Sequence, residues 1–485
     1  MRPGLPQIAT AWTLGLVAGL AAGCSRDVDA TPPMDTASGA DTGAGPDGGA
    51  THDDSRLTAV SARLHDDIGS MVIVSWDQAE PGTSAVRYMV DPGRWHSTPP
   101  VHREAGHHEQ LVLGVPYEHP VRLQVTLETD AGDRVRSSAI DLETAPWPDG
   151  LPRPVVRVHV EERTDPSTPW LLGSVTSDGA GWGSNWWVFI LDRKGRTVWA
   201  WESPDERVTM FARPSLDGST ILVDLDSYWW LFDGGAASEV ARIDIEGREL
   251  QRWPTPGLHH AFIDLPEGGI AWGGHGESDE YVAIVDDAGD IEQIWSCADL
   301  VGEPWAFSCI TNAIWLDTAT DRFLVSVVST DSVVVLDRQS GAQLDLYGSG
   351  RSAWAFDPPE SAFSHQHDPH LTDEGTLLVS TNGIRRERDT AVREYELDEE
   401  SHTLRQIWSF GDGEGIHADR LGTVQRLPGG NTQHGLGSAG RLREITPEGD
   451  VAWDVDWGEE NELGRTTAFE DIYRLLDGTA PAVSR

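Results

Sequence analysis

The sequence predicts an all-β protein in which a small β-sandwich precedes a six-bladed β-propeller. Apolar and polar residues alternate in short segments between residues 57 and 144, with the period of two that is typical of β-strands. After residue 150, an element built from Asp, Gly and an aromatic residue recurs along the chain. The chain has 485 residues, of which 39% are hydrophobic and 21 are tryptophan. It can therefore form substantial cores in roughly two to four domains.

Residues 1–23 have the pattern of a signal peptide. Arg2 precedes the apolar stretch Ala9–Ala22, which is too short to span a bilayer and ends in small residues. The run Leu20-Ala21-Ala22-Gly23-Cys24 resembles a bacterial lipobox, which implies that Cys24 is the lipid-bearing first residue of an exported lipoprotein. We expect the protein in the bacterial cell envelope, on the periplasmic side or at the surface of the outer membrane. A plain secretory signal with an incidental cysteine is the alternative.

Residues 24–56 are expected to form a flexible stalk. They are rich in Asp, Thr, Gly, Pro and Ala and contain almost no large apolar side chain, so they cannot bury enough surface to fold. The formal net charge of the whole chain is −43. This charge argues against nucleic-acid binding and against a polybasic membrane anchor, because both need a cationic surface.

Residues 57–148 are predicted to form the sandwich. Alternating segments at residues 71–76, 84–88, 110–113 and 121–127 indicate short strands joined by polar turns. Trp76 followed by Tyr88 resembles the core of a fibronectin type III module. The Pro- and Gly-containing run of residues 146–150 marks its end.

Residues 152–480 are predicted to form the propeller. In the first four copies an apolar residue and Asp precede a Gly, while the fifth copy keeps the Asp and the sixth keeps the Gly. An aromatic residue follows in all six, which indicates hairpins whose aromatic side chains pack between neighbouring sheets. The six copies run from Leu191 to Trp199, Ile243 to Trp253, Val285 to Trp295, Leu336 to Tyr347, Glu396 to Trp408 and Thr446 to Trp453. Such spacing favours six blades, and residues 466–476 are expected to form a strand that closes the ring.

The three cysteines suggest one disulfide. With Cys24 lipidated, Cys297 and Cys309 remain as a pair in an oxidising compartment. We expect them to close the short loop between them. Two isolated cysteines do not make a metal site, and a loop at residues 411–415 is as readily a plain turn as a calcium site.

Histidines of the second half cluster at similar places in successive repeats. The inner strands of a propeller line its channel, so histidines far apart in sequence can converge there. They are His259 and His260, then His365, His367 and His370, then His417 and His434. We expect His434 in the inner strand of the last blade.

Three segments resemble the bacterial aryl-sulfate sulfotransferases. Residues 259–268, HHAFIDLPEG, are similar to that family's HHD…LPNG element. Residues 364–383 are similar to its QHD…LPDGTLL…DNG element, and residues 426–453 to its closing LPNGNT stretch. The resemblance covers roughly residues 155–475, and the sandwich corresponds to the family's N-terminal β-domain.

The resemblance implies transfer of a sulfuryl group from one phenol to another, through a sulfohistidine and without a nucleotide donor. The matching site positions are His260 and His367, with Arg385 as a clamp for the sulfuryl oxygens; a solvated Arg385 is the alternative. For the nucleophile we favour His434, with His417 as its rival. Phenolic sulfates and phenols are then the substrates, and no cofactor or metal is expected. Ile310 stands where the family commonly has a histidine, two residues before Asn312.

Two other functions remain open. A surface-tethered propeller that binds a partner without catalysis has the same architecture, because fold alone does not assign chemistry. A quinoprotein-like dehydrogenase is less favoured, because a tryptophan docking motif does not recur in every repeat. Aryl sulfates are anions, so the favoured function requires a channel lined by His and Arg inside an acidic protein.

Overall fold

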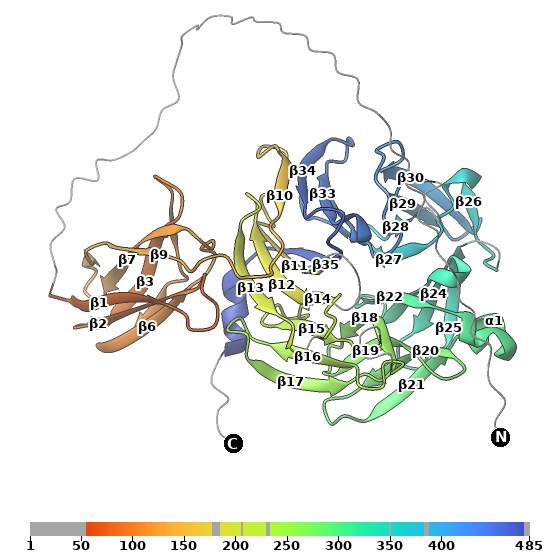
Figure 1. The fold of residues 1–485 in the computed structure, drawn as a ribbon, viewed down its shortest axis with the longest axis horizontal. Coiled ribbons are helices and arrows are strands. Elements are labelled where there is room, and N and C mark those ends of the chain that lie inside the picture. Colours follow the sequence, from red (N-terminus) through yellow and green to blue (C-terminus); the bar gives the residue numbers. More distant parts are fainter. Residues whose placement is uncertain are drawn as a thin grey trace, which may run out of the picture. The chain divides into compact units, whose positions relative to one another are not determined.

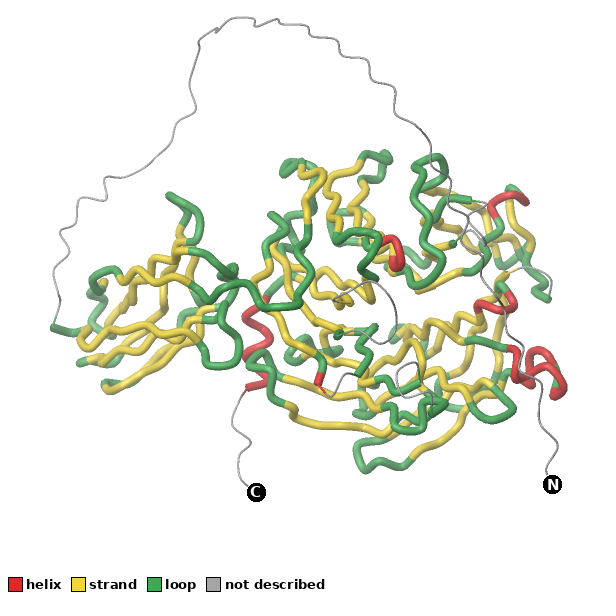
Figure 2. Tube along the Cα trace, in the orientation of Figure 1, coloured by secondary structure: helices red, strands yellow, loops and turns green. Residues whose placement is uncertain are grey.

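The computed structural model describes residues 55–176, 185–204, 207–228, 233–348, 351–382 and 388–479. Strands dominate these residues and helices are short, which confirms the all-β prediction (Figures 1 and 2). The predicted signal peptide, Cys24 and nearly all of the stalk lie outside the described residues. Within the described part of the chain, no helix is both long enough and apolar enough to cross a membrane.

Residues 57–143 form two sheets around a common core. The first sheet has the order β1 (Leu57–Leu64), β2 (Val72–Gln78) and β6 (Gly106–Val112). The second is built on the pair β3 (Gly82–Met89) and β7 (Pro120–Thr129), which β4 (Trp95–Ser97), β5 (Val101–Arg103), β8 (Arg134–Arg136) and β9 (Ile140–Glu143) extend. Every second residue of β7 is buried, and Trp76 of β2 is fully buried in the same core. The alternation in the sequence therefore marks the core-facing side chains, as predicted.

Residues 155–469 form six further sheets, and each connects mainly antiparallel neighbours. The first contains β35 (Leu463–Phe469), β11 (Trp170–Thr176), β12 (Trp186–Asp192) and β13 (Thr197–Glu202). The second contains β14 (Ala212–Pro214), β15 (Ile221–Leu225), β16 (Glu239–Ile243) and β17 (Glu249–Pro254). The third contains β18 (Leu258–Asp264), β19 (Ile270–His275), β20 (Glu280–Val285) and β21 (Ile291–Ser296).

The remaining three sheets continue this plan. The fourth contains β22 (Thr311–Asp317), β23 (Arg322–Val327), β24 (Ser332–Asp337) and β25 (Gln343–Gly348). The fifth contains β27 (Gln366–Leu371), β28 (Leu377–Thr381), β29 (Ala391–Asp398), β30 (Thr403–Phe410) and the parallel edge strand β26 (Ala355–Asp357). The sixth contains β31 (Thr423–Arg426), β32 (Thr432–Leu436), β33 (Arg441–Ile445), β34 (Val451–Asp456) and β10 (Val155–His159).

One edge strand of each of these sheets faces the neighbouring sheets (Figure 1). We call β35, β14, β18, β22, β27 and β31 the inner strands. β22 contacts both β18 and β27, and β31 contacts both β27 and β35. Side chains from separate parts of the sequence can therefore meet along these strands.

The repeated element forms a hairpin turn in all six sheets, as predicted, with both Asp and Gly in the first four. In the first, Oδ1 of Asp192 accepts hydrogen bonds from the amides of Lys194 and Arg196, and Gly195 has the positive φ of +74° that the turn requires. The aromatic residue then reaches the turn of the following sheet. Trp199 donates from Nε1 to the carbonyl of Ile245 at 2.7 Å. This contact joins neighbouring sheets and confirms the expected packing.

The C-terminal segment departs from the prediction. Residues 466–476 were expected to form one strand, but β35 begins earlier and ends at Phe469, and a 3-10 helix, η7 (Ile472–Thr479), follows it. β35 pairs with β11, so the last strand completes the first of the six sheets. Tyr473 of η7 hydrogen-bonds the backbone of Leu113 and so links the C-terminal segment to the N-terminal module.

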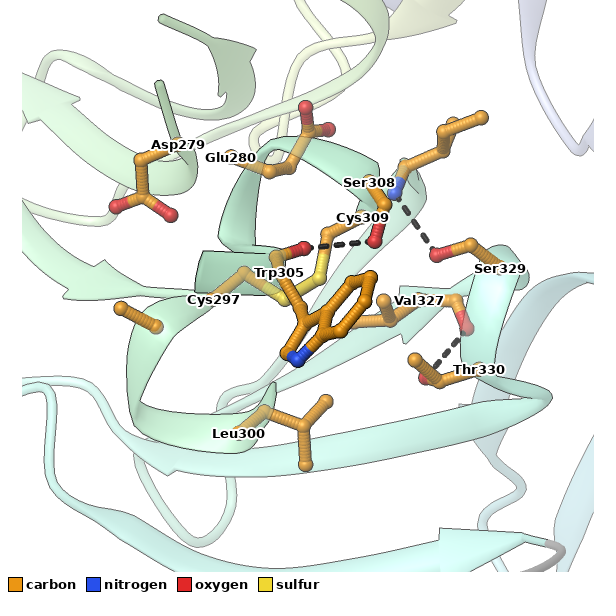
Figure 3. Close-up of a disulfide and its surroundings, with 12 residues drawn as sticks. Asp279, Glu280, Cys297, Leu300, Trp305, Ser308, Cys309, Val327, Ser329 and Thr330 are labelled. Carbon is orange, nitrogen blue, oxygen red and sulfur yellow. Dashed lines mark hydrogen bonds between the residues drawn. A yellow bond between two sulfur atoms is a disulfide. The ribbon is translucent and has the colours of Figure 1, made fainter. Parts of the chain in front are cut away.

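Cys297 and Cys309 form the predicted disulfide (Figure 3). The loop between them connects β21 to β22 and contains the helix α1 (Ala298–Val301) and the 3-10 helix η2 (Glu303–Ser308). The amide of Cys297 donates to the carbonyl of Glu280 at 2.8 Å. The closed loop therefore lies against the start of β20. Shorter 3-10 segments are η3 (Val328–Thr330), η4 (Pro359–Ser361) and η6 (Gly437–Ala439).

Candidate functional site

Two of the predicted site residues, His260 and His367, lie near each other on inner strands. His260 is on β18 and His367 is on β27. Burial of the His260 ring lowers its pKa well below the usual value, and the nearby His259 and His367 lower it further. Between these strands lies β22, where Asn312 donates from Nδ2 to the carbonyl of Gln366 at 2.8 Å. The two histidines therefore converge although 107 positions separate them in the sequence.

His367 is held as a neutral ring in one tautomer. Its Nδ1 lies 3.0 Å from the carbonyl oxygen of His365. The amide nitrogen of Asn382 lies farther from Nδ1, at 3.4 Å. Because the carbonyl is the closer partner and only accepts, we place the proton on Nδ1 and the lone pair on Nε2. Burial lowers the pKa of His367 to about 4. The ring is therefore uncharged at neutral pH, with a nucleophilic nitrogen.

His434 lies one strand away from its predicted place. We expected it on the inner strand of the last sheet, but it is on β32, which pairs with β31 on one side and β33 on the other. Its Nε2 is 2.9 Å from Oγ of Ser380 on β28. Burial, followed by the charge of Arg443, lowers its pKa to about 3.

Ser380 connects His434 to the surroundings of His367. A Cβ placed on Gly422 would lie 2.8 Å from Oγ of Ser380 and 3.3 Å from Cβ of His367. Only glycine therefore allows this close packing of the three residues. The Ser380 hydroxyl group therefore contacts His434 on one side, and Ser380 lies close to His367 on the other.

The other two predicted residues do not join this group within the described residues. His417 lies in the loop before β31, where Nδ1 donates to the carbonyl of Arg388 at 2.9 Å and Nε2 lies 3.3 Å from Asp389. A third of its side chain is exposed. Arg385 lies outside the described residues.

The structure adds two buried arginines that the sequence analysis missed. Arg465 of β35 forms an ion pair with Asp368 of β27 at 3.0 Å, and both side chains are 6% exposed. Arg213 of β14 is also buried, and burial, with Arg465 adding to it, lowers its pKa to about 10. Its Nε and Nη1 have no hydrogen-bond partner among the residues that the structure describes. Neither arginine belongs to a motif, so only tertiary contacts identify them.

Carboxylates accompany these arginines on the inner strands. Asp368 accepts a hydrogen bond from the amide of Val424 at 3.0 Å, and Asp264 of β18 accepts one from the amide of Leu216 at 2.7 Å. Asp264 and Asp368 both raise the pKa of Arg213 by their charge. The favoured function requires a channel lined by His and Arg, and in this part of the inner strands two aspartates accompany the two arginines.

Glu280 is a further buried carboxylate, and it accepts hydrogen bonds from two histidines of the third sheet. It accepts hydrogen bonds from Nε2 of His259 at 2.8 Å and from Nδ1 of His275 at 2.9 Å. The amide and hydroxyl of Thr311 add two more, each at 2.6 Å. His259 is adjacent to His260 in the sequence, but no motif in the sequence points to Glu280.

Comparison with known proteins identifies the family. Residues 239–458 match the family model described as Arylsulfotransferase (ASST). Over these residues, which are less than half of the chain, the protein is similar to the arylsulfotransferase family. The match supports an aryl sulfotransferase-type function and small-molecule substrates, and it confirms the resemblance found in the motifs. It includes His260, His367, His417 and His434.

Solved structures are similar to this chain only at low identity. A protein of unknown function from Bacteroides caccae is 17% identical, with a TM-score of 0.39 over 59% of this chain and 93% of that one. The Cps50 (Swd1) β-propeller domain of Myceliophteria thermophila is 12% identical, with a TM-score of 0.38 over 61% and 88%. A streptogramin B lyase is 13% identical, with a TM-score of 0.35 over 62% and 86%. No curated protein matches the chain.

The stability of this protein should fall as the pH drops from about 6.5 to about 4. His367 and His434 have folded-state pKa values of about 4 and about 3, below the 6.5 of an exposed histidine. The unfolded chain therefore binds protons first, so the stabilisation is complete above pH 6.5 and is lost on acidification. Urea unfolding at several pH values measures this effect. His434→Leu should flatten the dependence between pH 6 and pH 4, and a slope equal to that of the wild type would contradict the expectation.

Proposed function

We propose that this protein transfers a sulfuryl group from a phenolic sulfate ester to a phenolic acceptor, through a sulfohistidine and without a nucleotide sulfate donor. The family match supports the reaction class. The observation that carries the finer proposal is the pair of neutral imidazoles, His260 and His367, on the two inner strands that flank β22. A neutral imidazole is the form that can attack sulfur.

His367 is the nucleophile that the contacts favour. Its Nδ1–H is bound to a backbone carbonyl, so Nε2 is the nitrogen with the lone pair, and β27 is an inner strand. His434, which the sequence favoured, lies on a strand with partners on both sides and has Nε2 against Ser380. It remains the second candidate.

Cationic groups must meet the sulfuryl oxygens and the departing phenolate. We assign this role to Arg385, as the resemblance to the family motif implies. Arg213 is a further candidate, because its buried guanidinium has two N–H donors without a hydrogen-bond partner among the described residues. A planar guanidinium can hold two sulfuryl oxygens at once.

The finer architecture belongs to the same proposal. Pairing of β35 with β11 and the contacts among the inner strands support a six-bladed propeller. The two-sheet N-terminal module, with Trp76 and Tyr88 in its core, supports a fibronectin type III-like sandwich. We place the mature protein in the cell envelope, tethered through Cys24, on the strength of the N-terminal sequence and of a disulfide suited to an oxidising compartment.

The proposal is tested with purified protein, 4-nitrophenyl sulfate as donor and phenol as acceptor. We expect nitrophenol release that depends on phenol, formation of phenyl sulfate in equal amount, and ping-pong kinetics. Without phenol, release should stop after about one equivalent, when the sulfohistidine has formed. Protein that releases no nitrophenol with any phenolic acceptor would overturn the proposal and favour a non-catalytic, surface-tethered binding protein.

A further inference from the structure

Glu280 is a buried, ionised carboxylate whose oxygens accept hydrogen bonds from neighbouring strands. It is fully buried at the start of β20 and receives the four hydrogen bonds described above. Burial raises its pKa, but the charge of His259 and the hydrogen bonds from His259, His275 and Thr311 outweigh burial and lower the pKa to about 2. Its negative charge is therefore permanent at neutral pH.

The disulfide loop lies beside Glu280 (Figure 3), and residues at both ends of the loop donate hydrogen bonds to Glu280. At one end, Cys297 donates its amide to the Glu280 carbonyl. At the other end, Thr311 follows Cys309 by two residues and donates both its amide and its hydroxyl to the Glu280 carboxylate. Glu280 thus has one position, defined by β20 and by the two ends of the loop.

The hydrogen bonds also determine where protons lie on the adjacent histidines. A carboxylate only accepts, so His259 donates its Nε2–H to Glu280. Nδ1 of His259 is in hydrogen-bond contact with Nδ1 of His260. Such a contact needs one proton between the two nitrogens, because two lone pairs or two N–H groups would repel. The proton belongs either to His259 or to His260.

These two positions of the proton give His260 two chemical roles. In the first state, His259 carries a proton on Nδ1 and another on Nε2. Nδ1 of His260 then accepts the hydrogen bond from His259, and Nε2 of His260 carries a proton that it can donate. When His259 is neutral, Nδ1 of His260 carries the shared proton and Nε2 has the lone pair. The first state is an acid and the second is a base, and they differ by one proton in total.

We propose that Glu280 acts through His259 to make His260 a reversible proton donor and acceptor in sulfuryl transfer. This inference rests on the function proposed above. Neither Glu280 nor His259 touches the substrate in this scheme, so both are positioning residues. The negative charge of Glu280 stabilises the extra proton on the pair of histidines.

In the first half-reaction, Nε2 of His367 forms a bond to sulfur, and the bond from sulfur to the phenolic oxygen breaks. The electron pair of that bond goes to the oxygen, which takes the proton from Nε2 of His260. The shared proton then moves from His259 to Nδ1 of His260. His260 is left with a lone pair on Nε2, and the charge of the His259–Glu280 pair changes from zero to −1.

In the second half-reaction, the acceptor phenol gives its proton to Nε2 of His260 while its oxygen forms a bond to sulfur. The bond between sulfur and His367 breaks, and its electron pair returns to Nε2 of His367. The shared proton returns to His259. Proton count and charge are restored, and no further reactant is needed.

The kinetic test compares Glu280→Gln with Glu444→Gln. Glu444 is a matched control, because it is also fully buried and accepts hydrogen bonds from Arg193, Asp165 and Asn431, each at 2.6 Å. In ping-pong kinetics, kcat/KM for the donor reports the first half-reaction alone. With phenyl sulfate, whose phenolate leaves poorly, Glu280→Gln should lower this kcat/KM on the order of 10²- to 10³-fold. With 4-nitrophenyl sulfate, whose leaving group needs little protonation, the loss should be about tenfold or less. Equal losses with both donors, or the same pattern in Glu444→Gln, would overturn the proposal.

A spectroscopic test does not depend on turnover. In ¹⁵N-histidine-labelled wild-type protein, we expect a far-downfield imidazole proton attached to Nδ1, assigned to the His259–His260 pair by its loss in His260→Gln. The signal should disappear or move in Glu280→Gln and persist in Glu444→Gln. Its absence from the wild type, or its persistence unchanged in Glu280→Gln, would overturn the proton relay. A wild type that shows the signal but transfers no sulfuryl group would instead contradict the proposed function.

Discussion

Replacing His367 by glutamine should abolish phenol-dependent nitrophenol release, with a loss in kcat on the order of 10³-fold or more. Glutamine fills much of the same space and can still hydrogen-bond the His365 carbonyl, but it has no imidazole lone pair to attack sulfur. The burst of about one equivalent without phenol should disappear as well. Rapid-quench measurement of nitrophenol, with and without phenol, gives both quantities.

His370 offers the matched control for this variant. It lies on the same strand, is equally buried at 5% exposure, and donates from Nδ1 to a backbone carbonyl, that of Asp368, at 3.2 Å. Its ring packs on Trp315 at 4.9 Å between centroids. His370→Gln should therefore retain activity within about tenfold, since it removes a packed histidine and no reacting group.

A third variant, His434→Gln, separates the two candidate nucleophiles. If His434 only supports Ser380, this substitution should reduce kcat modestly and leave the burst intact, because an amide can also hydrogen-bond the Ser380 hydroxyl. Loss of the burst in His434→Gln, together with a normal burst in His367→Gln, would show that the nucleophile is His434, as the sequence suggested.

Arg465→Met should lower the free energy of unfolding by roughly 3–5 kcal/mol. The substitution leaves the carboxylate of Asp368 buried without its partner, and both side chains of the pair are only 6% exposed. Urea denaturation followed by tryptophan fluorescence measures the loss. The double variant Arg465→Met/Asp368→Asn should recover much of it, because it removes the isolated charge.

Arg405 provides the comparison at the surface. It lies within 4 Å of three carboxylates, those of Asp357, Glu396 and Asp398, yet half of its side chain is exposed. Arg405→Met should therefore cost less than about 1 kcal/mol, since solvent screens exposed ion pairs. If Arg465→Met cost no more than Arg405→Met, burial would not be the source of the effect.

The repeat elements were predictable because their chemistry is local. Asp192 binds amides two and four residues ahead, and Gly195 adopts the required positive φ within the same turn. All the information lies within five consecutive residues, and variants of this segment occur at five further turns. The disulfide was predictable by counting, because Cys297 and Cys309 were the two cysteines left after Cys24.

The histidine pair was predictable for a different reason. His260 and His367 occur in motif segments with fixed spacing, so each could be placed at the start of an inner strand. His434 was misplaced by one strand, because a five-residue strand and its neighbour have the same alternation in sequence. Only the pairing of β32 with both β31 and β33 distinguishes an inner strand from the next one.

No motif or pattern in the sequence predicted three residues that are buried beside the candidate site or its supporting residues: Arg213, Arg465 and Glu280. From the sequence alone, an arginine in a strand is predicted to be exposed to solvent. An acidic residue at the start of a strand is predicted to belong to a turn. Their partners, Asp368 for Arg465 and His259 and Thr311 for Glu280, come from other strands. Burial and pairing of this kind arise from the packing of sheets and leave no pattern within one segment.

The sequence by itself determined the all-β class, the six hairpin turns, the disulfide and the family, because each depends on short segments whose residues interact with one another or match a motif. The tertiary structure decided which histidine has its lone pair on Nε2, which strand carries His434, and where the buried charges meet. Those properties depend on contacts between strands far apart in the chain. Contacts of this kind exist only once the sheets have packed side by side.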